Sequence, residues 1–440
     1  MIRFMIGGTH SGCGKTTVTC AVLAALKARG HDVAAFKCGP DYIDPMFHRS
    51  VIGVGSHNLD SFFCDARTLN SILGEYSREV SVIEGVMGFY DGAVGSAYSV
   101  SQLTETPAVI VIDCKGMSDS AGAVMSGFLN YRRPNRIVGF IFDRLPQKLV
   151  PMVKRLCDEL GTEYLGCLPK HGEVFDSRHL GLVTAEEIAG LREKLKRLGE
   201  LAEEHICLDK LLSLEAPERS ERIEVTPPTA GTKPVIAAAR DRAFCFEYAE
   251  NHALLEKLGC EVRYFSPLAD GELPEADGLI LCGGYPELYA KELSENSSML
   301  RSVKAAVASG MPTIAECGGF MYLHHELTDK QGDTYPMAGV IDGRAYPTEH
   351  LRRFGYVTMT AARDGLLCGE GKQLKAHEFH YWDSTSCGDG FKAEKPDGRS
   401  WECCHVSGSL YAGFPHIYFY SDIRTAERFV SACAEYRKRK

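Results

Sequence analysis

A glycine-rich run lies close to the N-terminus and reads Gly7-Gly8-Thr9-His10-Ser11-Gly12-Cys13-Gly14-Lys15-Thr16-Thr17. The mainly apolar residues 1–6 before it predict a β-strand, and apolar residues at helical spacing after it predict a helix that ends near Gly30. A strand, a glycine-rich loop and a helix that opens on Gly-Lys-Thr are typical of a phosphate-binding loop, because the loop turns backbone N–H groups towards a phosphate. The sequence therefore predicts a nucleotide-binding α/β domain at the start of the chain.

The side chains of this loop predict how ATP and Mg²⁺ would be held. Lys15 would place a positive charge on the outer phosphates, and Thr16 would offer its hydroxyl to Mg²⁺. The alternative, a glycine-rich turn with no ligand, does not explain why strand, loop, lysine and helix occur together. We expect the ATP-binding residues to be Gly8, Thr9, Ser11, Gly12, Cys13, Gly14, Lys15, Thr16, Thr17 and Lys37.

The composition is that of a globular protein of two or three domains. The chain has 440 residues, of which 45% are hydrophobic and 24% charged, and its net charge is −9. This acidic balance argues against a nucleic-acid partner, and no apolar run is long enough to cross a bilayer. A strand predicted from the first residues leaves no room for a signal peptide, so we expect a cytoplasmic protein without a membrane partner. The 17 cysteines include no Cys-x-x-Cys pair and are expected to be reduced thiols.

Polar residues follow three further strands predicted in the first domain, at residues 33–36, 80–83 and 108–112. In open α/β sheets, ligands bind beyond the carboxyl ends of the strands. A carboxylate after a strand often only caps the next helix, so each acidic residue here also has a purely structural interpretation. The candidate acceptor-substrate residues are Asp41, Tyr42, Asp44, Asp60 and Asp91.

The same strand ends provide the candidate metal ligands. A carboxylate that faces the phosphate loop is what a nucleotide-bound metal needs, so we expect Mg²⁺ to be held by Thr16 and Glu84, with Asp41 as a further candidate. Lys37 could neutralise the charge that develops on a transferring phosphoryl group.

The chain divides at residues 214–233, a stretch with several proline, glutamate and threonine residues that predicts a linker. We expect one domain at residues 1–213 and a second α/β domain at residues 234–440. Further strands are predicted at residues 136–142, 164–168, 235–239, 261–265, 278–282 and 312–315, and helices at 148–160, 185–212 and 320–323.

A candidate nucleophile follows the last of these strands, within Ala315-Glu316-Cys317-Gly318-Gly319. A nucleophile between small residues on a sharp strand-to-helix turn fits the nucleophile-elbow pattern, and a helix N-terminus favours the thiolate. The candidate oxyanion donors are the backbone N–H groups of Gly283, Gly284 and Gly318. Most cysteines are core residues, but this context favours a catalytic Cys317.

A cysteine nucleophile also needs a base. Histidines occur at His377, at His380 and at His416, and the last of them follows the final strand-like run of the domain. We therefore expect His416 to act with Cys317.

Eight motifs spread over the whole chain carry a family resemblance. They are Gly8-to-Thr16, Phe36-Lys37-Cys38-Gly39-Pro40-Asp41-Tyr42-Ile43-Asp44-Pro45, Asn58-Leu59-Asp60, Glu84-Gly85-Val86-Met87-Gly88, Arg178-His179-Leu180-Gly181-Leu182, Cys282-Gly283-Gly284-Tyr285-Pro286-Glu287, Ala315-Glu316-Cys317-Gly318-Gly319 and His377-Glu378-Phe379-His380. With them the chain resembles the cobyrinic acid a,c-diamide synthase family. The first motif, with five residues between Gly8 and Gly14 where the strict pattern has four, resembles the loop of dethiobiotin synthetase. The resemblance implies two doubly wound α/β domains, an N-terminal P-loop parallel sheet and a C-terminal class I glutamine amidotransferase-like sheet.

The resemblance also implies a reaction and its partners. Glutamine would be hydrolysed at Cys317 through a thioester, ATP would phosphorylate a carboxylate of a corrin precursor, and the released ammonia would displace the phosphate. Activation by ATP is needed because a free carboxylate is a very poor electrophile towards ammonia. The expected partners are therefore ATP, L-glutamine and a tetrapyrrole polycarboxylate, and the sequence leaves monomer and homodimer open.

Two positions depart from related patterns. Class I amidotransferases carry a glutamate two residues after the catalytic histidine, where this chain has Tyr418. Resembling proteins of the cobyrinic and cobyric acid branches also lack that glutamate, which leaves Glu378 as a guess for the residue that orients His416. At Asp143, related ATPases often have asparagine.

Other functions remain open at this point. Nickel-sirohydrochlorin and hydrogenobyrinic acid are alternative acceptors for the same chemistry. A regulatory ATPase of the chromosome-partitioning type would use a similar loop, but its signature lysine is replaced here by His10. A binding or scaffold protein with inactive sites is the third alternative, and two complete motif sets argue against it.

Overall fold

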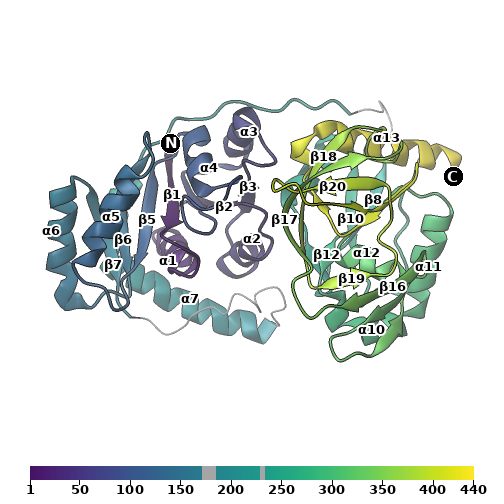
Figure 1. Ribbon diagram of the computed structural model, residues 1–440, viewed down its shortest axis with the longest axis horizontal. Coiled ribbons are helices and arrows are strands. Elements are labelled where there is room, and N and C mark those ends of the chain that lie inside the picture. Colours follow the sequence, from purple (N-terminus) through teal and green to yellow (C-terminus); the bar gives the residue numbers. More distant parts are fainter. Residues whose placement is uncertain (171–184, 228–232) are drawn as a thin grey trace. The chain divides into compact units, whose positions relative to one another are not determined.

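The computed structural model describes residues 1–170, 185–227 and 233–440. The chain forms two compact units, Met1–Ile223 and Glu224–Lys440, and each is described here by itself (Figure 1). The boundary between them lies inside the predicted linker. Before it, the Ile223 N–H donates to Ser71 Oγ at 2.8 Å, and Arg219 pairs with Glu105 at 2.9 Å. The first half of the predicted linker therefore packs onto the first unit.

The first unit is built on a seven-stranded parallel sheet of order β3-β2-β4-β1-β5-β6-β7. Its strands are β1 (Ile2–Gly8), β2 (Val33–Cys38), β3 (Ser56–Leu59), β4 (Val80–Glu84), β5 (Ala108–Asp113), β6 (Ile137–Asp143) and β7 (Glu163–Leu168). Every strand predicted for this domain is present. One further strand, β3, was not predicted, because its sequence Ser-His-Asn-Leu contains no apolar run.

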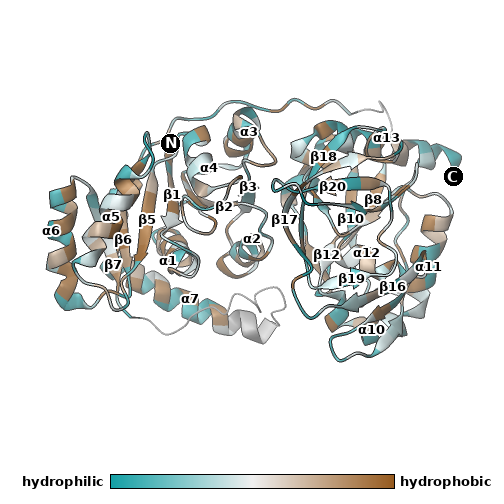
Figure 2. Ribbon diagram, in the orientation of Figure 1, coloured by the Kyte–Doolittle hydropathy of each residue, from teal (hydrophilic) through white to brown (hydrophobic). Residues whose placement is uncertain are grey.

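Helices cover this sheet, as expected when the strands read as continuous apolar runs. They are α1 (Lys15–Ala28), α2 (Ile43–Phe47), α3 (Ala66–Tyr76), α4 (Ala97–Thr104), α5 (Ser120–Asn130), α6 (Val150–Leu160), α7 (Ala185–His205) and α8 (Leu208–Leu212). In Figure 2 the central strands are predominantly hydrophobic, whereas α7 carries both hydrophobic and hydrophilic residues. No helix within the described residues is long and apolar enough to span a bilayer.

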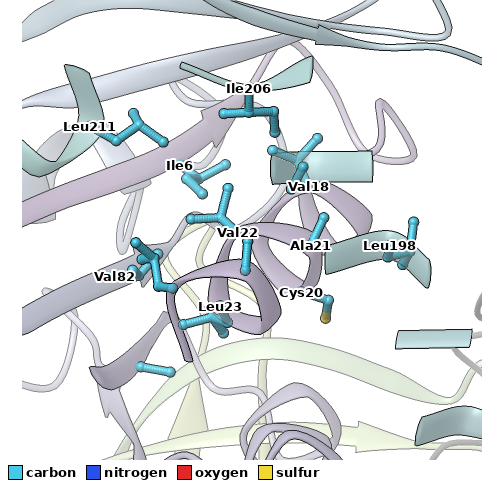
Figure 3. Packing of buried hydrophobic residues seen from close by; sticks show 14 of the residues in the cluster. Ile6, Val18, Cys20, Ala21, Val22, Leu23, Val82, Leu198, Ile206 and Leu211 are labelled. Carbon is cyan, nitrogen blue, oxygen red and sulfur yellow. The ribbon is translucent and has the colours of Figure 1, made fainter. Parts of the chain in front are cut away.

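The core of the first unit is centred on α1, which contacts β1 and β4 on one side and α7 on another. Val18 and Val22 of α1 lie among Ile6, Val82 and Leu198, all with at most 1% exposure (Figure 3). Full burial of one such side chain contributes about 1.5–3 kcal/mol to folding. This packing fixes the start of α1, and with it the loop that precedes the helix.

The second unit contains a six-stranded sheet of order β10-β8-β11-β13-β23-β22, parallel except for β22. Its strands are β8 (Val235–Ala239), β10 (Glu261–Phe265), β11 (Gly278–Leu281), β13 (Thr313–Glu316), β22 (His405–Val406) and β23 (Leu410–Gly413). The helices are α9 (Ala249–Lys257), α10 (Ala290–Glu295), α11 (Ser297–Ala308), α12 (Gly318–Tyr322) and α13 (Ile423–Arg439). The predicted α/β sheet is thus present.

Smaller sheets, which the sequence did not predict, complete the second unit. One has five antiparallel strands in the order β21-β20-β17-β18-β24, with β17 (Arg353–Ala361), β18 (Gln373–His380), β20 (Phe391–Glu394), β21 (Ser400–Cys403) and β24 (His416–Ile417). Another has the order β15-β14-β16-β19, with β14 (His324–Thr328), β15 (Thr334–Pro336), β16 (Ile341–Pro347) and β19 (Trp382–Ser384). A two-stranded ribbon pairs β9 (Phe244–Phe246) with β12 (Gly283–Gly284).

Candidate active sites

The predicted phosphate loop connects β1 to α1. Gly12 and Gly14 have φ angles of 81° and 97°, which a side chain would make strained. A Cβ atom at Gly8 would lie 2.3 Å from Cys13 Sγ, so only glycine fits there. Lys15 is 7% exposed, and its Nζ donates to the carbonyl of His10 at 3.1 Å. The backbone of the loop therefore surrounds the Lys15 side chain and accepts a hydrogen bond from it.

A buried charge cluster lies at the carboxyl ends of β2 and β4, beside the loop. Strand register places Lys37 directly opposite Glu84, and their side chains approach to 2.9 Å. Lys37 Nζ also pairs with Asp44 at 2.5 Å, while the Thr16 hydroxyl donates to Glu84 at 2.6 Å. The structure thus brings together the predicted metal-site residues Thr16 and Glu84 and the predicted phosphoryl-stabilising Lys37. Asp41 lies at the edge of the cluster, 3.8 Å from Lys37.

The electrostatics of this cluster favour an additional cation. Burial raises the pKa of Glu84 to about 7, although Lys37 opposes that shift, and burial raises the pKa of Asp41 to about 6. Among the described residues, Glu84 Oε2 has no hydrogen-bond partner. His48 Nε2 lies 3.7 Å from it, but burial lowers the pKa of His48 to about 4, so this imidazole is neutral at pH 7. A buried carboxylate with a spare oxygen suits Mg²⁺.

The candidate acceptor residues have identifiable local roles. Asp60 accepts from the Phe62 N–H at 2.8 Å, and Asp41 accepts from the N–H groups of Ile43 and Asp44 at 2.9 and 3.0 Å. Asp91 accepts from the Gly88 N–H at 2.9 Å, beside the phosphate loop. The half-buried Tyr42 lies directly before α2. These hydrogen bonds give Asp41, Asp60 and Asp91 the turn-stabilising role of the structural alternative, and their contact with a substrate stays a prediction.

Residues not predicted for this site also approach the loop. A Cβ atom at Gly14 would lie 2.3 Å from a carboxylate oxygen of Asp143, which is 1% exposed. Arg144, in the left-handed region at φ 58°, pairs with Asp113 at 2.5 Å. In the sequence, only Asp143 had indicated this part of the site, since related ATPases often have asparagine at that position. The predicted motif at residues 178–182 lies outside the described residues.

The candidate nucleophile lies at the carboxyl end of β13, where the chain turns sharply into α12. Cys317 has φ 48° and ψ −102°, a strained conformation for a residue with a side chain, and is 6% exposed. Its N–H donates to the carbonyl of Gly413 at 2.8 Å. Because that N–H is engaged in the sheet, an oxyanion would need donors from neighbouring residues.

The predicted glycines and His416 converge on this turn. A Cβ atom at Gly283 would lie 2.4 Å from His416 Cε1, and one at Gly318 would lie 3.0 Å from the Gly284 nitrogen. Burial alone would lower the pKa of His416, but hydrogen bonding with Cys317 and Glu316 outweighs it and raises that pKa to about 10. An imidazolium at neutral pH favours a thiolate partner.

The carboxylate that lies beside His416 belongs to Glu316. The sequence had suggested Glu378 for this role. Glu316 Oε2 lies 3.6 Å from His416 Nδ1, and its Oε1 accepts from the Ile417 N–H at 2.9 Å. Glu378 instead lies 3.5 Å from His380. Glu316 directly precedes the nucleophile in sequence, but only the pairing of β13 with β23 shows that it reaches His416.

His377 lies opposite His416 in the pairing of β18 with β24. Burial and the nearby charge of His416 lower the pKa of His377 to about 3. His377 is therefore neutral at pH 7 and does not compete with His416 for a proton.

Replacement of Glu316 by glutamine should lower the glutaminase kcat roughly 10- to 100-fold, since part of a general-acid/base contribution is lost. The change removes a charge that raises the pKa of His416, so the imidazolium should deprotonate at lower pH. The alkaline limb of the pH–rate profile should therefore move towards neutrality. Glu378→Gln is the matched control and should leave that limb in place. An unchanged alkaline limb in Glu316→Gln would show that Glu316 does not act on His416.

Comparison with known proteins identifies two domain families in the chain. Residues 4–182 match the family described as the CobQ/CobB/MinD/ParA nucleotide binding domain, and residues 235–422 match the CobB/CobQ-like glutamine amidotransferase domain.

Curated relatives match the chain over nearly its full length. The cobyrinate a,c-diamide synthase of Caldanaerobacter subterraneus subsp. tengcongensis is 38% identical, with 98% of each chain covered. The proteins of the same name from Listeria innocua and Thermoplasma volcanium are 38% and 35% identical, over 96% and 100% of this chain and 97% and 98% of theirs. The two domain matches and these full-length similarities show that the chain belongs to the cobyrinate a,c-diamide synthase family.

Proposed function

We propose that the protein is an ATP- and glutamine-dependent ligase that amidates the a and c carboxylates of cobyrinic acid. One observation carries the proposal: a single chain combines a Cys317–His416–Glu316 arrangement with a phosphate loop that adjoins a buried Lys37–Glu84 cluster. The names of the full-length relatives support the choice of acceptor.

The glutamine site would release ammonia through a covalent intermediate. The Cys317 thiolate attacks the side-chain amide carbon of glutamine, and the resulting oxyanion accepts hydrogen bonds from N–H groups of Gly283, Gly284 or Gly318. The His416 imidazolium donates its proton to the leaving nitrogen, so that ammonia departs and a thioester remains. Water then attacks the thioester while His416 takes up its proton, which frees glutamate and regenerates the thiolate.

The phosphate loop would activate the acceptor. An oxygen of the acceptor carboxylate attacks the γ-phosphorus of ATP and forms an acyl phosphate with release of ADP. Lys15 and Lys37 stabilise the charge that develops on the transferring group. Ammonia then attacks the acyl carbon and expels phosphate, which leaves an amide and one proton. The same sequence on a second carboxylate completes the diamide.

The charge cluster fits Mg²⁺ through Thr16 and the spare oxygen of Glu84, with Asp41 as a further candidate. When bound there, the metal ion supplies positive charge that offsets the phosphate charge of ATP. Burial raises the pKa values of Glu84 and Asp41, so a cation bound there would favour their charged forms.

The acceptor can be tested directly. Purified protein should convert cobyrinic acid to its a,c-diamide when supplied with ATP, Mg²⁺ and glutamine, as followed by mass spectrometry. Nickel-sirohydrochlorin and hydrogenobyrinic acid serve as parallel acceptors, because the same chemistry could act on either. If cobyrinic acid gave no diamide and another acceptor gave a product, the proposed substrate would be wrong and the proposed reaction would still hold.

A further inference from the structure

The strand that carries His416 stands at the edge of the five-stranded sheet. This strand, β24, has two residues, and it pairs with β18 so that His416 lies opposite His377. An edge strand presents N–H and C=O groups that its sheet does not use, and a strand of two residues makes few ladder hydrogen bonds. The position of the His416 backbone therefore depends on contacts from other parts of the unit.

Side chains from two other elements bind the backbone of Ile417, the residue after His416. The Ile417 N–H donates to Glu316 Oε1 at 2.9 Å, and its carbonyl accepts from Asn251 Nδ2, also at 2.9 Å. Ile417 is 1% exposed, and buried backbone groups of this kind are nearly always paired in native proteins. The edge of β24 is thus closed by one side chain from β13 and one from α9.

Asn251 also binds the chain two residues further on. Its Oδ1 accepts from the Phe419 N–H at 2.8 Å, so one amide group contacts the backbone on both sides of Tyr418. Asn251 is half-buried in the first turn of α9, and its backbone N–H donates to the carbonyl of Tyr248 at 3.0 Å. Both the oxygen and the nitrogen of the side-chain amide have a partner, which fixes the orientation of the group.

Tyr418 occupies the position at which class I amidotransferases carry a glutamate. It is 1% exposed, and its ring packs edge-on against that of Tyr248 at 4.8 Å, directly before α9. A phenol has no carboxylate with which to orient an imidazolium, and here Glu316 lies beside the imidazole instead. The segment after His416 is thus held by α9, through Tyr248 and Asn251.

We propose that Asn251 is a positioning residue of the glutaminase reaction, which keeps His416 at the distance and angle from Cys317 that proton transfer requires. The inference rests on the proposed roles of Cys317 and His416. Asn251 would act through the backbone that directly follows the imidazole, because its two hydrogen bonds go to Ile417 and Phe419. A shift of a catalytic group by about 1 Å can cost roughly 100-fold in rate, so the placement of this backbone matters for turnover.

The first test is the glutaminase reaction of full-length Asn251→Ala. The kcat should fall roughly 10- to 100-fold, as expected when a general acid/base is displaced but not removed. The KM for glutamine should stay within about twofold, since the variant loses no contact proposed for the substrate. Asn296→Ala is the matched control and should keep kcat: Asn296 is likewise half-buried in this unit and donates to the carbonyls of Pro267 and Asp270 at 2.9 and 2.8 Å.

Alkylation of Cys317 gives a readout that does not depend on turnover. Its rate with iodoacetamide, followed on the Cys317 peptide by mass spectrometry, reports the fraction of thiolate at each pH. Contact with the His416 imidazolium stabilises the thiolate, so the unmodified protein should still react at acidic pH. In Asn251→Ala the midpoint should rise towards that of a free thiol, at about pH 8.5. Glu316 and His377, which also lie beside His416, are unchanged in this variant.

Asn251→Asp covers the case in which the alanine variant does not fold. It keeps the size of the side chain and the acceptor for the Phe419 N–H and loses the donor to Ile417, so its kcat should lie below that of the unmodified protein. An unchanged kcat in a folded variant would overturn the inference. So would an equal loss in Asn296→Ala, because the effect would then be one of general stability. If the unmodified protein itself titrated as a free thiol, the proposed Cys317–His416 pair would be wrong, and the inference with it.

Discussion

Cys317→Ser should abolish glutamine-dependent amidation and leave ammonia-dependent amidation intact. Loss of a nucleophile that acts with a base removes roughly three or more orders of magnitude in rate, so glutamate release should fall to background. The measurement compares diamide formation with glutamine and with ammonium chloride at a pH where free ammonia is abundant. In the mechanism proposed above, the thiol serves only to supply ammonia, so external ammonia should bypass it.

The substitution is also a small structural change. The strained turn at φ 48° is retained by serine, and the N–H bond to Gly413 does not involve the side chain. Cys260→Ser is the control: Cys260 is 3% exposed and directly precedes β10, which lies three strands from β13 in the sheet. It should keep both activities. Glutamine-dependent product from Cys317→Ser would mean that another residue is the nucleophile.

Local sequence patterns were sufficient to predict the framework that carries both sites. Continuous apolar runs indicated all strands of the first unit except β3, because a buried parallel strand must be apolar on both faces. The phosphate loop and the cysteine elbow were predictable for a related reason. Each is a short segment whose backbone conformation depends on its own glycines and on the elements that directly flank it.

Contacts between distant segments were not predictable in this way. Glu316 reaches His416 only because β13 pairs with β23, which brings together residues 100 positions apart in sequence. The five-stranded antiparallel sheet was missed because its strands are buried on one face only, so their apolar residues alternate with polar ones instead of forming continuous apolar runs.

Lys15→Ala should abolish amidation with either nitrogen source and leave the glutaminase site chemically intact. Removal of a cation that stabilises a transferring phosphoryl group costs roughly a thousand-fold or more in rate. The variant is structurally mild, because burial already lowers the pKa of Lys15 and its Nζ makes only a hydrogen bond to the His10 carbonyl within the described residues. The melting temperature should therefore stay close to that of the unmodified protein.

Lys37→Ala provides the contrast that separates catalysis from stability. Lys37 faces Asp44 and Glu84, so its removal leaves buried carboxylates without their cation and should cost about 3–5 kcal/mol of stability, along with activity. Mg²⁺ should recover part of that loss if Glu84 contributes to a metal site, since a ligand that binds only the folded state stabilises it. Calorimetry of both variants with and without Mg²⁺ makes the comparison. Ammonia-dependent amidation that survives Lys15→Ala would place ATP activation somewhere other than this loop.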